Sequence, residues 1–128
     1  MRTVSVGEAQ ALHRRLLTGE DPTAPHEVAN MYLDNLTEWL IALNPRVHPH
    51  DCSTAAENAI LTYIKSPQKY RPQRQTPEVY LRVSAKNKLR NILRSERQYM
   101  KHLVNMEAAD KSPTLERVMN LVRLTKPA

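Results

Sequence analysis

Glycine is nearly missing from this chain, which has two glycines, nine prolines and no phenylalanine in 128 residues. Barrels and sandwiches need many tight turns and strands rich in aromatic or β-branched residues. We therefore expect an all-α fold, a compact bundle of four to five helices. The length suits one domain that buries roughly two-thirds of the surface of its unfolded chain.

Start and stop signals predict two helices in the N-terminal part. Ser5 and Glu8 form a capping box that begins the first helix, and Gly19 ends it. The second begins near residues 23–25 and runs to about Ala42. The side chains expected to face the core are Val6, Ala9, Leu12 and Leu16, then Val28, Met31, Tyr32, Asn35, Leu36, Trp39 and Leu40.

Two longer helical patterns follow a proline-containing loop at 44–50. Asp51, Ser53 or Thr54 is expected to cap a third helix that ends before Ser66. After a loop at 66–75, the longest helix should run from Pro77 to about Lys101. Their expected buried residues are Ala55, Ala56, Ala59, Ile60, Tyr63 and Ile64, then Leu81, Ala85, Leu89, Ile92 and Leu93. We assign residues 1–102 to the helical domain and 103–128 to a C-terminal tail or linker, with a short helix expected at 112–122.

Positive charge is concentrated between Lys65 and Lys101. Eleven of these 37 residues are Lys or Arg, and the two acids are Glu78 and Glu96, so the segment carries +9 while the whole chain carries +6. The alternative explanation is a solvent-exposed helix face, which is often rich in Lys and Arg, but ordinary exposed helices intersperse acids with bases and this segment has few acids. A polyanion would relieve the repulsion and release counterions, so nucleic acid is the expected partner.

Other candidate sites are weaker. Tyr70 and Tyr80 lie within the basic segment, where each could stack on an unpaired base or pack the loop against the helix. His48, His50 and Cys52 lack the paired spacing of a zinc site, and a quiet buried thiol is expected for Cys52. No catalytic motif stands out, so we expect neither an enzyme nor a cofactor. One cysteine, no signal peptide and no membrane-spanning run predict a cytoplasmic protein.

Three segments of the chain match the patterns of one known family, in order and correctly spaced. Residues 51–64 are similar to D-A-E-D-L-V-Q-E-A-F-L-R-L-W, with Ser53 and Thr54 in place of its acidic pair, and residues 67–74 match P-x-x-Y-x-P-x-R. Residues 80–94 are similar to W-L-x-x-I-A-R-N-x-x-x-D/N-x-L-R, with Tyr80 in place of tryptophan. Over about residues 27–98 the chain thus resembles domain two of bacterial extracytoplasmic-function sigma factors.

The resemblance implies a transcription initiation module that binds core RNA polymerase and recognises and melts the −10 promoter element. The third helix would dock on the clamp helices of the largest subunit through Asp51, Thr54, Glu57, Asn58 and Leu61. The loop at 70–76 would capture a base flipped from the non-template strand. The residues implied to bind DNA are Lys69, Tyr70, Arg71, Arg74, Gln75, Thr76, Tyr80, Lys86, Asn87, Arg90, Asn91, Arg94 and Arg97.

The family also has a domain four, a helix-turn-helix module that recognises the −35 element. The 27 residues after Lys101 are too few to encode it, so we expect it to be absent from this chain. An anti-sigma factor is a further partner that the resemblance implies, and no membrane partner is expected. Two alternatives remain: a helical protein that binds DNA or RNA without sequence preference, and a sigma-like adaptor that binds proteins but no DNA.

Overall fold

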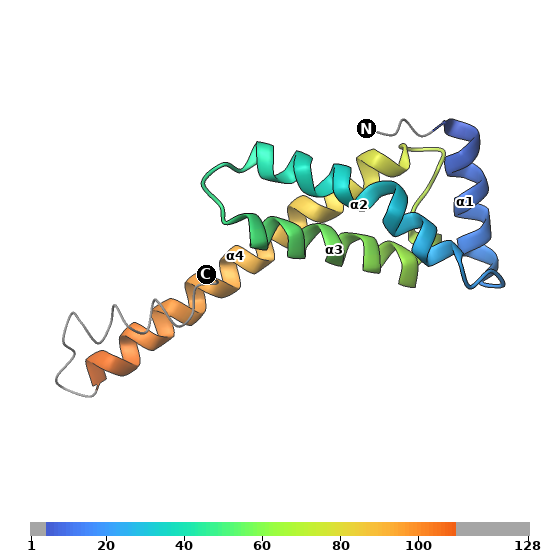
Figure 1. Cartoon of the computed structure of the whole chain (residues 1–128). Helices are drawn as coiled ribbons and strands as arrows, with labels where there is room; N and C mark the ends of the chain where they lie inside the picture. Colours follow the sequence, from blue (N-terminus) through green and yellow to red (C-terminus); the bar gives the residue numbers. More distant parts are fainter. Residues whose placement is uncertain (1–4, 110–128) are drawn as a thin grey trace. The chain divides into compact units, whose positions relative to one another are not determined.

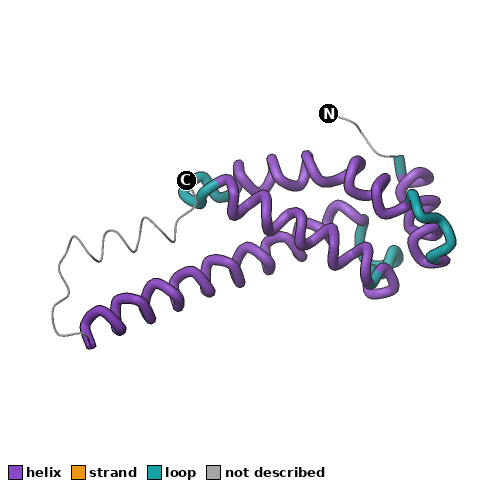
Figure 2. The backbone as a smooth tube through the Cα atoms, turned by 60° about the horizontal axis from the view of Figure 1, so that its bottom comes forward, coloured by secondary structure: helices purple, strands orange, loops and turns teal. Residues whose placement is uncertain are grey.

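The computed structural model describes residues 5–109, and every regular element in that range is helical (Figures 1 and 2). Four α-helices and one short 3-10 helix follow one another, which confirms the predicted all-α bundle. The chain divides into two compact units, Met1–Leu89 and Arg90–Ala128. The helix expected at 112–122 lies outside the described residues.

Helix α1 (Val6–Thr18) begins and ends as its sequence predicts. The Ser5 hydroxyl oxygen accepts a hydrogen bond from the Glu8 amide at 3.1 Å, which satisfies one of the free donors of the first turn. Gly19 ends the helix with φ 68°, a left-handed conformation that glycine adopts without a Cβ clash. Val6 was expected to face the core but is 71% exposed, because it precedes the first buried turn at Ala9.

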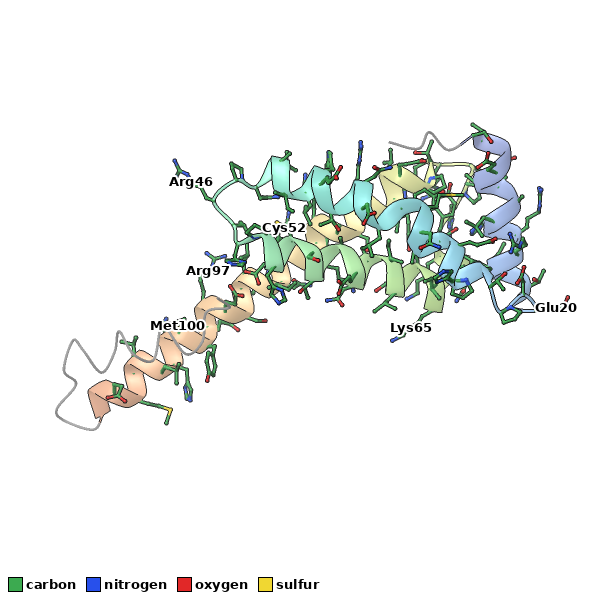
Figure 3. All side chains as sticks on the ribbon, viewed as in Figure 1. Glu20, Arg46, Cys52, Lys65, Arg97 and Met100 are labelled. Atoms are coloured by element: carbon green, nitrogen blue, oxygen red, sulfur yellow. The ribbon has the colours of Figure 1, made fainter. Side chains whose placement is uncertain are left out.

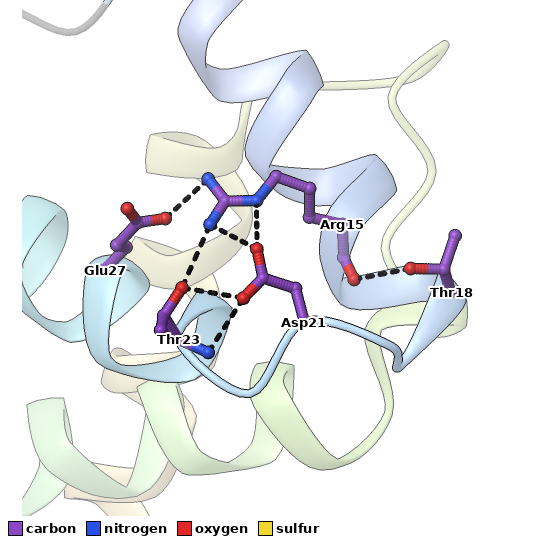
Figure 4. Close-up of polar contacts among 5 residues, drawn as sticks. All are labelled: Arg15, Thr18, Asp21, Thr23 and Glu27. Carbon is purple, nitrogen blue, oxygen red and sulfur yellow. Dashed lines mark hydrogen bonds and ion pairs between the residues drawn. The ribbon is translucent and has the colours of Figure 1, made fainter.

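Helix α2 (Ala24–Leu43) is tied to the end of α1 by Arg15. Its guanidinium forms ion pairs with Asp21 and Glu27 and donates a hydrogen bond to the Thr23 hydroxyl (Figure 4). Asp21 also accepts hydrogen bonds from the amide and hydroxyl of Thr23, and these bonds together with Arg15 lower the pKa of its carboxyl to about 2. This network fixes the turn between α1 and α2.

Helix α3 (Pro49–Lys65) begins two residues before the earliest predicted cap, so the expected caps Asp51, Ser53 and Thr54 are wrong. His48 caps it instead, because its Nδ1 accepts a hydrogen bond from the His50 amide at 3.0 Å. Proline at the first helical position already has a helical φ and lacks an N–H to satisfy. Asp51 therefore lies inside the first turn, where its side chain is buried.

Two elements follow α3. A 3-10 turn, η1 (Pro67–Lys69), lies within the predicted loop, and helix α4 (Pro77–Ala109) runs eight residues further than expected. The Thr76 hydroxyl oxygen accepts a hydrogen bond from the Val79 amide at 3.3 Å and caps the start of α4. None of the described helices is both apolar and long enough to span a membrane.

The core of the first unit forms where α2 and α3 lie side by side (Figures 1 and 2). The three alanines of α3, Ala55, Ala56 and Ala59, are almost fully buried, and such small side chains let helices approach closely. Leu81, Ala85 and Leu89 of α4 are buried in the same unit, as predicted.

Two core predictions have different outcomes. Trp39 was expected in the core but is only partly buried, and the Arg82 guanidinium lies over its ring at 4.9 Å from the centroid in a cation–π contact. Cys52 is fully buried, its Sγ lies 3.9 Å from the Leu40 carbonyl oxygen, and burial raises the pKa of its thiol (Figure 3). The predicted burial of the thiol is confirmed.

Candidate nucleic-acid interface

The loop at residues 70–76 is closed by Tyr70. Its hydroxyl donates a hydrogen bond to the Gln75 carbonyl oxygen at 2.8 Å, and the Arg74 amide donates to the Arg71 carbonyl oxygen at 3.0 Å. The Tyr70 side chain is only 5% exposed. Tyr70, which the sequence left open to stack on a base or to pack the loop, therefore serves as the internal anchor of the loop.

The anchor is part of an aromatic cluster, which we define as His13, Tyr63, Tyr70 and Tyr80. The Tyr70 ring meets the other three with centroids 4.8, 5.8 and 5.2 Å away, mostly edge to face. Of the two interpretations of Tyr70 and Tyr80, stacking on a base or packing the loop against the helix, the geometry matches packing. The cluster joins α1, α3, the loop and α4 within the first unit.

His13 brings a hydrogen bond into the cluster. Its Nδ1 lies 2.7 Å from the Tyr63 hydroxyl, and the two rings stack with centroids 5.8 Å apart. Burial lowers the pKa of His13 below its ordinary value of 6.5 and raises the pKa of Tyr63 above 10. Both side chains are therefore neutral at pH 7, as a buried pair without a counterion requires.

A pocket of about 570 Å³, called here the loop pocket, lies between α1 and the loop. From the loop and the start of α4 it is lined by residues that include Tyr70, Arg74, Gln75 and Thr76, which were all predicted to bind DNA. From α1 it is lined by Gln10, His13 and Arg14, which sequence reasoning missed. Their spacing of three and four residues placed them on one helical face, but no sequence signal showed what that face meets.

A second hollow, of about 690 Å³, flanks the same loop. Arg14, Arg71 and Arg74 line it together with Gln68 and Leu17. All three arginines are exposed, and within residues 5–109 no ion pair joins any of the three to an acid. The loop thus presents three cations to solvent without ion pairs, although Glu78 also lines the loop pocket, and exposed cations attract phosphates.

The remaining residues predicted to bind DNA are divided between the units. In the first, Lys69, Lys86 and Asn87 are exposed and Tyr80 is half-buried; none of these four lines the loop pocket. Four belong to the second unit: Arg90, Asn91, Arg94 and Arg97 are all exposed there. The three arginines recur at four and three residues, so they share one face of α4.

The residues predicted to bind polymerase differ in exposure along α3. Glu57 and Leu61 are exposed, Leu61 at 49%, and Thr54 and Asn58 are half-buried. Asp51 is 7% exposed, which leaves little of its carboxylate for a partner. The exposed side chains of Leu61 and Glu57 offer a protein partner a contact surface, but that surface is small.

Within residues 5–109, no three His, Cys, Asp or Glu side chains lie close enough together to hold a metal ion. His48 instead caps α3, as described above.

Comparisons of the chain with models of protein families, with characterised proteins and with solved structures found no match. The chemistry of the loop and its pocket therefore carries the functional argument.

Proposed function

We propose that this chain is a sigma-like transcription initiation module. In this proposal, the outer face of α3 binds core RNA polymerase, and the loop at 70–76 captures a base from the separated non-template strand of a −10 element. The cationic faces of α4 hold the phosphates of that strand. The module makes and breaks no covalent bond.

The observation that carries the proposal is the loop pocket beside exposed arginines that form no ion pair in the described residues. A pocket of about 570 Å³ falls within the range of roughly 300–1,000 Å³ typical of small-ligand sites. Arg14 and Arg74 line it, and both also line the second hollow together with Arg71. An unstacked base needs an enclosed site, and the strand that carries it needs cations close by.

Rigidity of the loop supports the same function. Unstacking a base step costs a few kcal/mol, and the protein must offset this cost with contacts that are already in place. The Tyr70 hydrogen bond and the aromatic cluster hold the loop in one conformation before any strand arrives. Binding therefore loses little loop entropy.

The test is a pull-down of polymerase subunits followed by binding of single-stranded −10 oligonucleotides. With core polymerase, the chain should bind a −10 strand more tightly than a scrambled one. Arg74→Ala and Asn87→Ala should reduce this preference. The control Arg46→Ala, which removes an exposed arginine from the turn between α2 and α3, should leave it unchanged (Figure 3). Failure to retain polymerase, or a preference that survives both variants, would contradict the proposal.

A second candidate is binding of single strands without sequence preference. The exposed arginines of the second unit favour it, because a cationic helix face holds phosphates whatever the sequence. Equal affinity for −10 and scrambled strands, with a steep loss of affinity as salt rises, would identify this function instead.

A further inference from the structure

The second hollow beside the loop collects three arginines from two segments that are distant in sequence. Arg14 comes from α1, which lies outside the residues that resemble the sigma family, and Arg71 and Arg74 come from the loop. We infer that these three guanidiniums together bind one phosphodiester of the strand, next to the base that the loop pocket holds. The inference rests on the proposed function and adds a phosphate site to which α1 contributes.

Charge distinguishes the second hollow from the loop pocket. Glu78 lines the loop pocket, and its carboxylate repels a phosphate. Within residues 5–109, no Asp or Glu lines the second hollow, and the Lys and Arg side chains that line it are Arg14, Arg71 and Arg74. A phosphate is therefore better stabilised in the second hollow, whereas a base, which carries no charge, is tolerated beside Glu78.

The two cavities adjoin each other, because Arg14, Tyr70 and Arg74 line both of them. In a nucleotide one sugar joins the base to its phosphate, so a base in the loop pocket places that phosphate within reach of the second hollow. The hollow of about 690 Å³ is much larger than one phosphate group, and the exposed Leu17 adds apolar surface to it. It therefore suits a sugar–phosphate segment of a strand better than free inorganic phosphate.

The three arginines extend from anchored backbone. Arg14 follows His13, whose ring meets the Tyr70 ring edge to face. Arg71 and Arg74 belong to one turn, which the hydrogen bond from the Arg74 amide to the Arg71 carbonyl oxygen closes. Each forked guanidinium can donate two parallel hydrogen bonds to phosphate oxygens. Several arginines are needed, because one exposed charge pair contributes little by itself.

The experiment measures binding of the whole chain to a fluorescent oligothymidine by anisotropy over a range of salt concentrations. Each phosphate contact on a single strand contributes about 0.7 to the slope of log affinity against log salt. Arg14→Ala should therefore weaken binding about fivefold at low salt and reduce the slope by up to about 0.7. Arg14→Lys should restore the slope but only part of the affinity, because lysine keeps the charge and lacks the fork.

Binding of one phosphodiester by several arginines predicts two further results. The double variant Arg14→Ala with Arg71→Ala should lose less affinity than the product of the two single losses, because both side chains hold the same group. Inorganic phosphate and polyglutamate, added at equal concentrations of anionic groups, should displace the labelled strand far less than unlabelled oligothymidine does. Displacement by either one that equals that of oligothymidine overturns the inference.

Arg46→Ala is the matched control, since it removes an exposed arginine that lines neither cavity. Its effect on affinity and slope should be smaller than that of Arg14→Ala. Equal effects of these two variants, fully multiplicative losses in the double variant, or no strand binding by the unmodified chain overturns the inference and leaves the proposed function standing. Loss of polymerase in the pull-down, with the Arg14 effects intact, contradicts the proposed function and leaves the phosphate site in place.

Discussion

The hydrogen bond between His13 and Tyr63 offers the sharpest test of the structure. Tyr63→Phe removes a hydroxyl that lies 2.7 Å from the His13 Nδ1 and keeps the ring. Tyr63 is 3% exposed and His13 is 5% exposed, so water does not easily replace the lost partner. The substitution thus separates the hydrogen bond from the packing of the aromatic cluster.

The expected loss follows from leaving a buried imidazole nitrogen unpaired. Such an orphaned polar group costs about 1–3 kcal/mol, whereas replacing both partners by apolar groups of similar shape can be nearly neutral. Tyr63→Phe should therefore lower the free energy of unfolding by about 2 kcal/mol. The double variant His13→Leu with Tyr63→Phe should recover most of that loss.

Urea denaturation followed by circular dichroism at pH 7.5 measures these differences. Tyr99→Phe is the control, because the same hydroxyl is removed from a side chain that is 52% exposed, and its effect should stay within about 0.5 kcal/mol. If Tyr63→Phe matched this control, the His13 nitrogen would have another partner and the reasoning would be refuted. A double variant less stable than the single one would refute the pairing itself.

Three further predictions concern stability and reactivity. Burial lowers the pKa of His13 below 6.5, so the stability that depends on its neutral form is complete above pH 6.5 and is lost as pH falls through the folded-state pKa. His13→Leu should therefore flatten the pH dependence of the free energy of unfolding between pH 7 and 5. An unchanged slope would contradict this. Gly19→Ala should lower the free energy of unfolding by about 1 kcal/mol because φ is 68° there, whereas Gly7→Ala, inside α1 with open space around it, should raise it by about 0.4–1 kcal/mol. Thermal unfolding of both variants measures these changes, and a shift of both melting temperatures in the same direction would contradict the prediction. Cys52 should react with a thiol reagent only in urea, since its side chain is fully buried and burial raises the pKa of its thiol, and fast labelling of the native chain would count against its placement.

Local signals predicted the helices well where the deciding residues are close in sequence. The Ser5 cap, the Gly19 stop and the start of α4 at Pro77 all depend on contacts within a few positions, so a linear pattern is enough. The start of α3 was missed because Pro49 and His48 together begin the helix before the expected caps. Asp51 was thereby placed inside the helix and largely buried.

The candidate site was less predictable, because its parts come from distant segments. Tyr70 was correctly placed in the basic loop, but its burial depends on His13 and Tyr63, which lie 57 and seven residues earlier. The aromatic ring that looked available for a base is enclosed by helix α1. The spacing of residues within α1 or within the loop does not show that the two segments pack against each other.

The sequence alone determined that the chain is helical, where most helices begin and end, and that its cations gather between residues 65 and 101. These properties follow from composition, caps and spacing of three and four residues. Tertiary structure decided that α1 packs beside the loop, that Tyr70 anchors rather than projects, and that Gln10 and Arg14 share a pocket with Arg74. The reason is physical: side-chain burial depends on which helices meet, and that depends on every apolar face in the unit at once.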